Sequence, residues 1–167
     1  MKLLFEEQQK FTQWWLWLLL ATVAIVPFYA FFQMLFISDD FGENLLSDKS
    51  VLVTFLVFMI VIVFFLVVKL KTEIDQEELR LRFLPFTKKT VKWSDVKSAR
   101  VLKYGFVGGW GIRLFTHYGT VYNTKGNKGL AIELENGDNF LIGTQKQEEL
   151  STVIENLRIQ GKLKNTL

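Results

Sequence analysis

Two long apolar runs constrain this chain more than any other feature. Residues 14–36 form 23 consecutive positions without a charged side chain, and residues 51–68 form 18 more in which Thr54 is the one polar member. A helix needs about 20 apolar residues to cross the hydrocarbon core of a bilayer. Both runs also lack the polar interruptions at helical spacing that a core helix of a soluble protein shows. We therefore predict two membrane-spanning helices, at residues 14–36 and 51–68.

The distribution of charge predicts how these spans are oriented. The connecting residues 37–50 carry four acidic residues and one lysine, a balance of −3, whereas residues 69–167 carry 17 basic and 11 acidic residues, a balance of +6. Positive segments remain on the cytoplasmic side. We expect a multi-pass protein of the cell (inner) membrane with both termini cytoplasmic, in which residues 1–13 are a cytoplasmic N-terminus. The acidic loop would be external, and its carboxylates (Asp39, Asp40, Glu43) could also hold a divalent cation weakly.

Beyond the second span the apolar pattern changes to a period of two. Leu79, Leu81 and Phe83 alternate with charged residues, as in a strand with one buried face. About seven such short runs, separated by turn residues, predict an antiparallel β-sandwich or open barrel. One amphipathic helix follows, with its apolar stripe at Leu150, Val153, Ile154 and Leu157. The predicted fold class is therefore α+β with a membrane anchor: a cytoplasmic domain at residues 71–160 and a tail at residues 161–167.

Three local signals predict where elements of this domain turn or end. Asn136-Gly137 is typical of a type I′ hairpin, in which both central residues have positive φ. Thr144 and Gln147 have the spacing of a capping box at the start of the helix. Gly161 is suited to ending that helix.

The order of seven strands followed by one amphipathic helix resembles the pleckstrin-homology (PH) fold. The run Gly108–Leu150, with its pieces GGWGIR, GNKG and LIGTQ, is similar to bacterial PH-like membrane proteins, in which a two-helix membrane hairpin precedes one such domain. Gln147 departs from the proline that often follows the lysine of GTQK in that family. The resemblance implies a fold and a membrane location, and it implies no established activity.

The most unusual motif is KYGFVGGWGIRLF, residues 103–115. It lacks the Gly-Lys-Ser/Thr ending of a phosphate loop, and strand-like residues follow it where a dinucleotide loop would need a helix. We expect bent sheet, in which the glycines permit a bulge and the tryptophan folds over apolar surface. A ligand-lining role for Trp110 and Arg113 is the alternative. The structural motif comprises Gly108, Gly109, Trp110, Gly111 and Arg113.

Basic residues offer two candidate contacts for anions or lipid headgroups. In the turn TKGNKG, Lys125, Asn127 and Lys128 could form a backbone nest with two cations beside it, or a solvated hairpin turn. The second candidate is a basic set next to the second span, which could face anionic headgroups or only enforce topology. It comprises Lys69, Lys71, Arg80, Arg82, Lys88, Lys89 and Lys92.

No catalytic constellation, cofactor motif or metal-ligand set emerges from the residues, and the chain has no cysteine. The single histidine, His117, lies in the turn THYGT without metal-ligand neighbours in sequence. We predict a non-enzymatic module that binds a protein partner or organises an assembly at the inner membrane face, with no cofactor and no nucleic-acid partner. The alternative is an accessory subunit of a transporter or membrane-bound enzyme complex that interacts through its hairpin.

Overall fold

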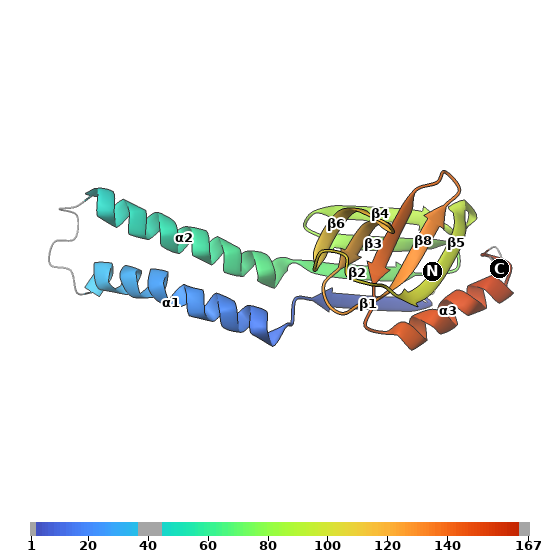
Figure 1. Ribbon diagram of the computed structural model, residues 1–167, viewed down its shortest axis with the longest axis horizontal. Helices are drawn as coiled ribbons and strands as arrows, with labels where there is room; N and C mark the ends of the chain where they lie inside the picture. The colour runs from blue at the N-terminus through green and yellow to red at the C-terminus, as the bar shows by residue number, and fades with distance from the viewer. Residues whose placement is uncertain (1–2, 37–44, 164–167) are drawn as a thin grey trace. The chain divides into compact units, whose positions relative to one another are not determined.

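A computed structural model describes residues 3–36 and 45–163 and divides the chain into two units (Figure 1). Thr12–Val67 is a helical hairpin, and Met1–Phe11 together with Val68–Leu167 form a second unit, here named the β-domain. The predicted segments 1–13 and 71–160 thus belong largely to one folded unit. The acidic residues Asp39, Asp40 and Glu43 lie outside the described residues.

The helical hairpin consists of α1 (Trp14–Phe36) and α2 (Leu45–Val67). Both helices are long and apolar enough to cross a membrane, as predicted from their composition. The second helix starts earlier than the predicted span and includes Asp48 in its first turn. The two helices pack through aromatic rings: Phe55 stacks on Phe31 with ring centroids 4.0 Å apart and meets Phe28 edge-on at 5.0 Å.

The β-domain contains two sheets and one closing helix. The first sheet is antiparallel, in the order β1 (Phe5–Lys10), β2 (Lys69–Ile74), β3 (Glu78–Leu84) and β4 (Thr87–Lys92). The second has the order β5-β8-β9-β7-β6. Its strands are β5 (Val96–Lys103), β6 (Gly111–Thr116), β7 (Gly119–Asn123), β8 (Lys128–Leu134) and β9 (Asn139–Gly143). A short 3-10 helix, η1 (Trp93–Asp95), joins the sheets, and α3 (Gln147–Ile159) follows β9.

The described residues contain nine strands rather than about seven, and one pair is parallel. Strands β1 and β4 were not predicted because their inward positions are mostly polar: Phe5 is the one apolar inward residue of β1, and Val91 is the buried residue of β4. The parallel pair is β7 with β9, so the expectation of a wholly antiparallel domain is wrong at this point.

The main core fills the space between the sheets and α3. Its fully buried members come from both sheets and the helix: Phe5, Leu70, Leu81, Phe83, Leu130, Phe140, Leu150 and Leu157. The predicted stripe of α3 is confirmed, since Leu150, Ile154 and Leu157 are buried. A smaller cluster of Tyr104, Val121 and Leu141 forms a second set of buried contacts.

Strand β1 contributes polar as well as apolar contacts to the interior. The Glu7 carboxylate accepts hydrogen bonds from the Thr144 hydroxyl at 2.6 Å and from the Gln145 backbone N–H at 2.8 Å. The Gln9 amide donates to the carbonyl of Gly143 at 2.7 Å and accepts from the Thr124 hydroxyl at 3.1 Å. These bonds satisfy polar groups that would otherwise be costly to bury, and they tie the N-terminal strand to the loops after β7 and β9.

The turn and helix-end predictions have mixed outcomes. The Asn136-Gly137 hairpin exists, but only Gly137 has positive φ (88°); its N–H donates to the carbonyl of Leu134 at 3.0 Å, which gives a three-residue loop rather than type I′. Asn136 stays outside the left-handed region because its side chain accepts from the N–H of Asp138.

The capping box is wrong at the start of α3, and the predicted end is confirmed. Lys146 is the N-cap and makes no side-chain cap hydrogen bond, and the Thr144 hydroxyl oxygen accepts from the Lys146 N–H at 3.0 Å rather than from Gln147. At the other end Gly161 has φ 71°, and the N–H of Lys162 donates to the carbonyl of Leu157 at 3.0 Å. That bond, together with one from the Gly161 N–H to Arg158, is a Schellman motif.

The pairing of β1 with β2 yields a testable prediction about folding. We expect the β-domain to fold when residues 12–67 are replaced by Asn-Gly, because antiparallel neighbours can be joined by a two-residue turn. Residues 68–167 alone should be much less stable, since losing the buried Phe5 ring by itself costs about 3–5 kcal/mol. Urea unfolding followed by circular dichroism measures both. Equal unfolding midpoints would contradict the structural role of β1.

Candidate functional site

The glycine-rich motif is a bend held by one buried amide. Gly108, Gly109 and Gly111 have φ of 86°, 108° and 113°, values that favour glycine. The Asn123 side chain accepts a hydrogen bond from the Gly111 N–H at 3.0 Å and donates one to the Tyr104 hydroxyl at 3.0 Å. The motif therefore closes on a side chain of β7, and the three glycines adopt backbone conformations that such a bend uses.

The Tyr104 ring joins this bend to the TKGNKG turn. Its hydroxyl donates to the carbonyl of Gly126 at 3.2 Å, and its backbone N–H donates to the carbonyl of Asn127 at 2.9 Å. Burial raises the pKa of the Tyr104 hydroxyl, and the hydrogen bond from Asn123 opposes part of that shift. The phenol therefore remains a neutral hydrogen-bonding group around neutral pH and holds the two motifs together.

The two motifs line one pocket, which we name the tyrosine pocket. Its volume is about 410 Å³. The lining residues come from the loop after β5 and from the end and following turn of β7: Tyr104, Gly105, Phe106, Val107, Gly109, Trp110, Asn123, Gly126 and Asn127. Trp110 is thus a lining residue with 36% of its surface exposed. Arg113 lies outside the pocket lining and donates from its guanidinium to the carbonyl of Trp110 at 2.8 Å.

The lysines of the TKGNKG turn are outside the lining of the tyrosine pocket. Lys125 and Lys128 are exposed. The backbone carbonyls of Lys125 and Asn127 accept hydrogen bonds from Gln145 and Tyr104, respectively. The turn therefore has a structural role in the domain, and its two ammonium groups remain at the surface.

The basic residues of β2 and β3 are paired with carboxylates on one face of the first sheet. The Lys71 ammonium lies 2.8 Å from Glu6 and 2.6 Å from Glu73, and Arg80 lies 3.3 Å from Glu73 and 3.0 Å from Asp75. The hydrogen bond from Lys71 holds the pKa of Glu73 below its usual value, although partial burial opposes the shift. Much of the positive charge predicted to face a bilayer is therefore balanced within the sheet.

The lysines of β4 divide between two faces. Lys88 lies opposite Arg82 in register, and Lys89 lies opposite the buried Leu81. Successive residues of a strand point to opposite faces. The Lys89 ammonium lies over the Phe140 ring, 4.1 Å from its centroid. Lys92 lies on the same face of β4 as Lys88 and is exposed. These three lysines do not form one continuous patch.

A second, larger hollow runs beside β5, and we name it the β5–α3 groove. Its volume is about 760 Å³, and β5 is the last strand on this side of the second sheet among the described residues. Strand and helix residues form its two walls: Ala99, Arg100, Val101 and Leu102 on β5, with Ser151, Thr152, Ile154, Glu155, Asn156 and Arg158 on α3. The Arg158 guanidinium donates to the carbonyl of Ala99 at 3.2 Å and so fixes the helix against the strand.

A third hollow of about 330 Å³ is lined by residues that include Arg100, His117 and Glu133. The exposed His117 ring lies against Tyr118, with centroids 3.8 Å apart. Among the described residues no group of three or more His, Asp or Glu side chains gathers into a metal-binding arrangement.

Comparison with known proteins adds no assignment to this geometry. No protein-family model matches the chain, and no curated protein matches it significantly. Its function must therefore be argued from its residues and their arrangement.

The glycine bend yields a paired prediction on stability. Gly111→Ala should lower the free energy of unfolding by about 1–3 kcal/mol, because φ of 113° is strained for a residue with a Cβ. Gly105→Ala is the matched control, since it has open space and no positive φ, and it should be neutral or stabilising by up to about 1 kcal/mol. Urea unfolding of the protein in which Asn-Gly replaces residues 12–67 measures both changes in the free energy of unfolding. A loss at Gly105 as large as that at Gly111 would contradict the strain argument.

Proposed function

We propose that this protein is a membrane-anchored, PH-like binding module that holds a protein partner at the inner face of the cell membrane without catalysing a reaction. The β5–α3 groove is the observation that carries this proposal. It combines a terminal sheet strand, whose outer backbone edge beyond the Arg158-bonded carbonyl of Ala99 can accept another strand, with a helix wall of 13 residues. Such an edge can add an extended peptide by main-chain hydrogen bonding, while pockets beside it select side chains.

The chemistry of the groove walls suits an extended segment with both apolar and charged side chains. Val101 and Leu102 are half-buried on the strand wall, and Ile154 is buried on the helix wall. Arg100 and Glu155 are exposed at the rim. Apolar contact in the centre with charge at the rim is the usual composition of a protein-binding surface.

The PH-like assignment is supported by the order of elements. Two sheets are followed by a C-terminal amphipathic helix that packs on both, as the sequence resemblance implies. The five-stranded second sheet and its parallel β7–β9 pair depart from seven antiparallel strands. The assignment therefore rests on the helix-capped two-sheet arrangement rather than on strand count.

Membrane anchoring is supported by the two apolar helices and by how the β-domain surrounds them in sequence. The hairpin is inserted between β1 and β2, which are adjacent strands of one sheet. Both helix ends that border the β-domain must therefore be on the same side of a membrane. The positive balance of residues 69–167 supports the cytoplasm as that side.

Orientation is tested with single cysteines, since the chain has none of its own. In intact cells, or in spheroplasts where an outer membrane blocks entry, an impermeant thiol reagent should label a cysteine at Asn44 and spare one at Asn136. Asn136 is suitable because it is exposed on the β8–β9 turn. Labelling at Asn136 alone would reverse the proposed orientation.

The groove itself is tested by site-specific photocrosslinking in the native membrane. A photoreactive residue at Asn156, on the helix wall, should give a discrete protein adduct, and Thr152→Trp should abolish it by filling the groove. Thr152 is exposed, so this variant should keep its melting temperature. The same photoreactive residue at Asn136 is the control for random collision.

A photoreactive residue at Val57 distinguishes the alternative function. Val57 is exposed on α2. Adducts formed from Val57 but not from Asn156 would overturn the groove proposal. They would favour an accessory subunit that binds a transporter or membrane-bound enzyme complex through its helical hairpin.

A further inference from the structure

Three large apolar side chains are exposed on β6 and the loop that leads into it. Phe106, Leu114 and Phe115 have 91%, 59% and 99% of their surfaces exposed, and we name them the apolar edge. Strand β6 is the terminal strand of the second sheet on this side, opposite β5. Exposed apolar residues gathered on one element mark a contact surface more often than scattered ones do.

The backbone at Phe115 directs this ring outward. Phe115 has φ of 58°, an uncommon value for a residue other than glycine, within a register shift between Arg113 and Thr116. A bulge of this kind turns the side chains of an edge strand away from the regular ladder. The ring is almost fully exposed, so packing of this ring in the described part of the β-domain does not offset the backbone cost. A contact between the Phe115 ring and a surface outside the β-domain would account for this backbone conformation.

Strand pairing and one ring contact place the start of β6 near the end of the domain where β1 ends and β2 begins. Leu70, the second residue of β2, lies opposite Phe83. The Phe83 ring lies 6.5 Å from that of Tyr122, and Tyr122 is paired with Ile112 on β6. Figure 1 shows β6 at the same end of the two sheets as the end of β1.

Chain connectivity keeps this end close to the helical hairpin at any angle between the two units. Lys10 closes β1 four residues before Trp14, and Lys69 opens β2 two residues after Val67. Extended chain spans at most about 3.6 Å per residue, so these distances are limited to about 14 Å and about 7 Å. The end of the domain that bears β6 is therefore tethered next to the point where the chain would leave a bilayer.

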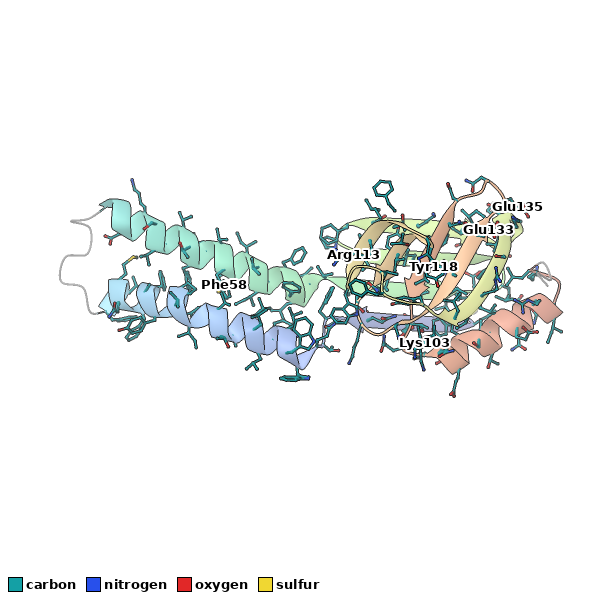
Figure 2. All side chains as sticks on the ribbon, in the orientation of Figure 1. Phe58, Lys103, Arg113, Tyr118, Glu133 and Glu135 are labelled. Atoms are coloured by element: carbon teal, nitrogen blue, oxygen red, sulfur yellow. The ribbon has the colours of Figure 1, made fainter. Side chains whose placement is uncertain are left out.

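Three charged residues lie where this orientation of the domain would favour them. Figure 2 shows Arg113 on β6 at this end and Glu133 and Glu135 at the opposite end. Arg113 would be near anionic headgroups, and the two carboxylates would be kept away from them. Basic residues next to an anionic surface are favoured by about 1 kcal/mol each.

We propose that the apolar edge inserts into the interfacial layer of the bilayer, so that β6 and its preceding loop form a lipid-binding surface. This inference rests on the membrane anchoring proposed above. Aromatic side chains are favoured at the level of the headgroups, and apolar residues there are buried about 5–10 Å deep. A second copy of the chain fits less well, because a stable interface buries about 1,200–2,000 Å², which is more than three side chains supply.

The test uses the full chain in vesicles of phosphatidylcholine and phosphatidylglycerol, with one cysteine per variant carrying an environment-sensitive dye. Lipids spin-labelled near the headgroup are the quenchers. Dyes at Phe106 and Phe115 should be quenched several-fold more strongly than a dye at the exposed Asn136. In the variant labelled at Phe106, Phe115→Ser should weaken the quenching, whereas Ile159→Ser, which removes an exposed apolar residue of α3, should leave it unchanged.

Each other outcome overturns the inference in a distinguishable way. A dye at Val57, quenched by lipids spin-labelled deep in the acyl chains, reports on anchoring itself. If Val57 is quenched and the two edge positions behave like Asn136, lipid docking fails and anchoring stands. If Val57 is not quenched, both proposals fail. Rapid disulfide formation between two copies of Phe115→Cys, without lipid quenching, would assign the edge to a second copy of the chain.

Discussion

The ladder between β1 and β2 is the constraint on which the rest of this structure depends. Six residue pairs, from Phe5 with Ile74 to Lys10 with Lys69, join segments that the whole helical hairpin separates in sequence. Closing so long a loop costs entropy, which the buried contacts of β1 must exceed. Those contacts are apolar at Phe5 and polar at Glu7 and Gln9, and without them Thr144 and Thr124 would lose their buried partners. The β-domain therefore depends on one edge strand that pairs across the inserted hairpin.

Sequence patterns predicted individual helices and strands better than they predicted which segments contact one another. The apolar runs gave both helices, and the alternation at Leu79, Leu81 and Phe83 gave β3, because each carries a period that only one kind of element produces. Strand β1 escaped detection because its inward Glu7 and Gln9 are satisfied by loops more than 100 residues away. The tyrosine pocket and the β5–α3 groove were not predicted either, because each is formed where separate segments of the chain meet.

The count of basic residues overestimated the positive charge available to a bilayer, because some of these residues are paired with carboxylates. Arg80 and Lys71 read as cations available to a bilayer, yet carboxylates of β1 and β2 lie within 3.5 Å of them. Pairing shifts the pKa of Lys71 upward, chiefly through Glu6, and that of Glu73 downward, so both groups are charged at neutral pH while their fields largely cancel at a distance. A membrane contact of this domain would therefore depend more on apolar side chains than on net charge, and would respond less to salt.

The two proposed surfaces constrain each other through the order of the second sheet. Strand β5 borders the groove and β6 bears the apolar edge, and three strands separate them. Docking of β6 on lipid would therefore leave the groove open toward the cytoplasm, whereas docking through β5 would bury it. Because Arg158 fixes α3 to β5 and Asn123 fixes the loop before β6 to β7, both surfaces are part of one hydrogen-bonded sheet. A lipid contact at one edge would thus set the direction from which a partner reaches the other.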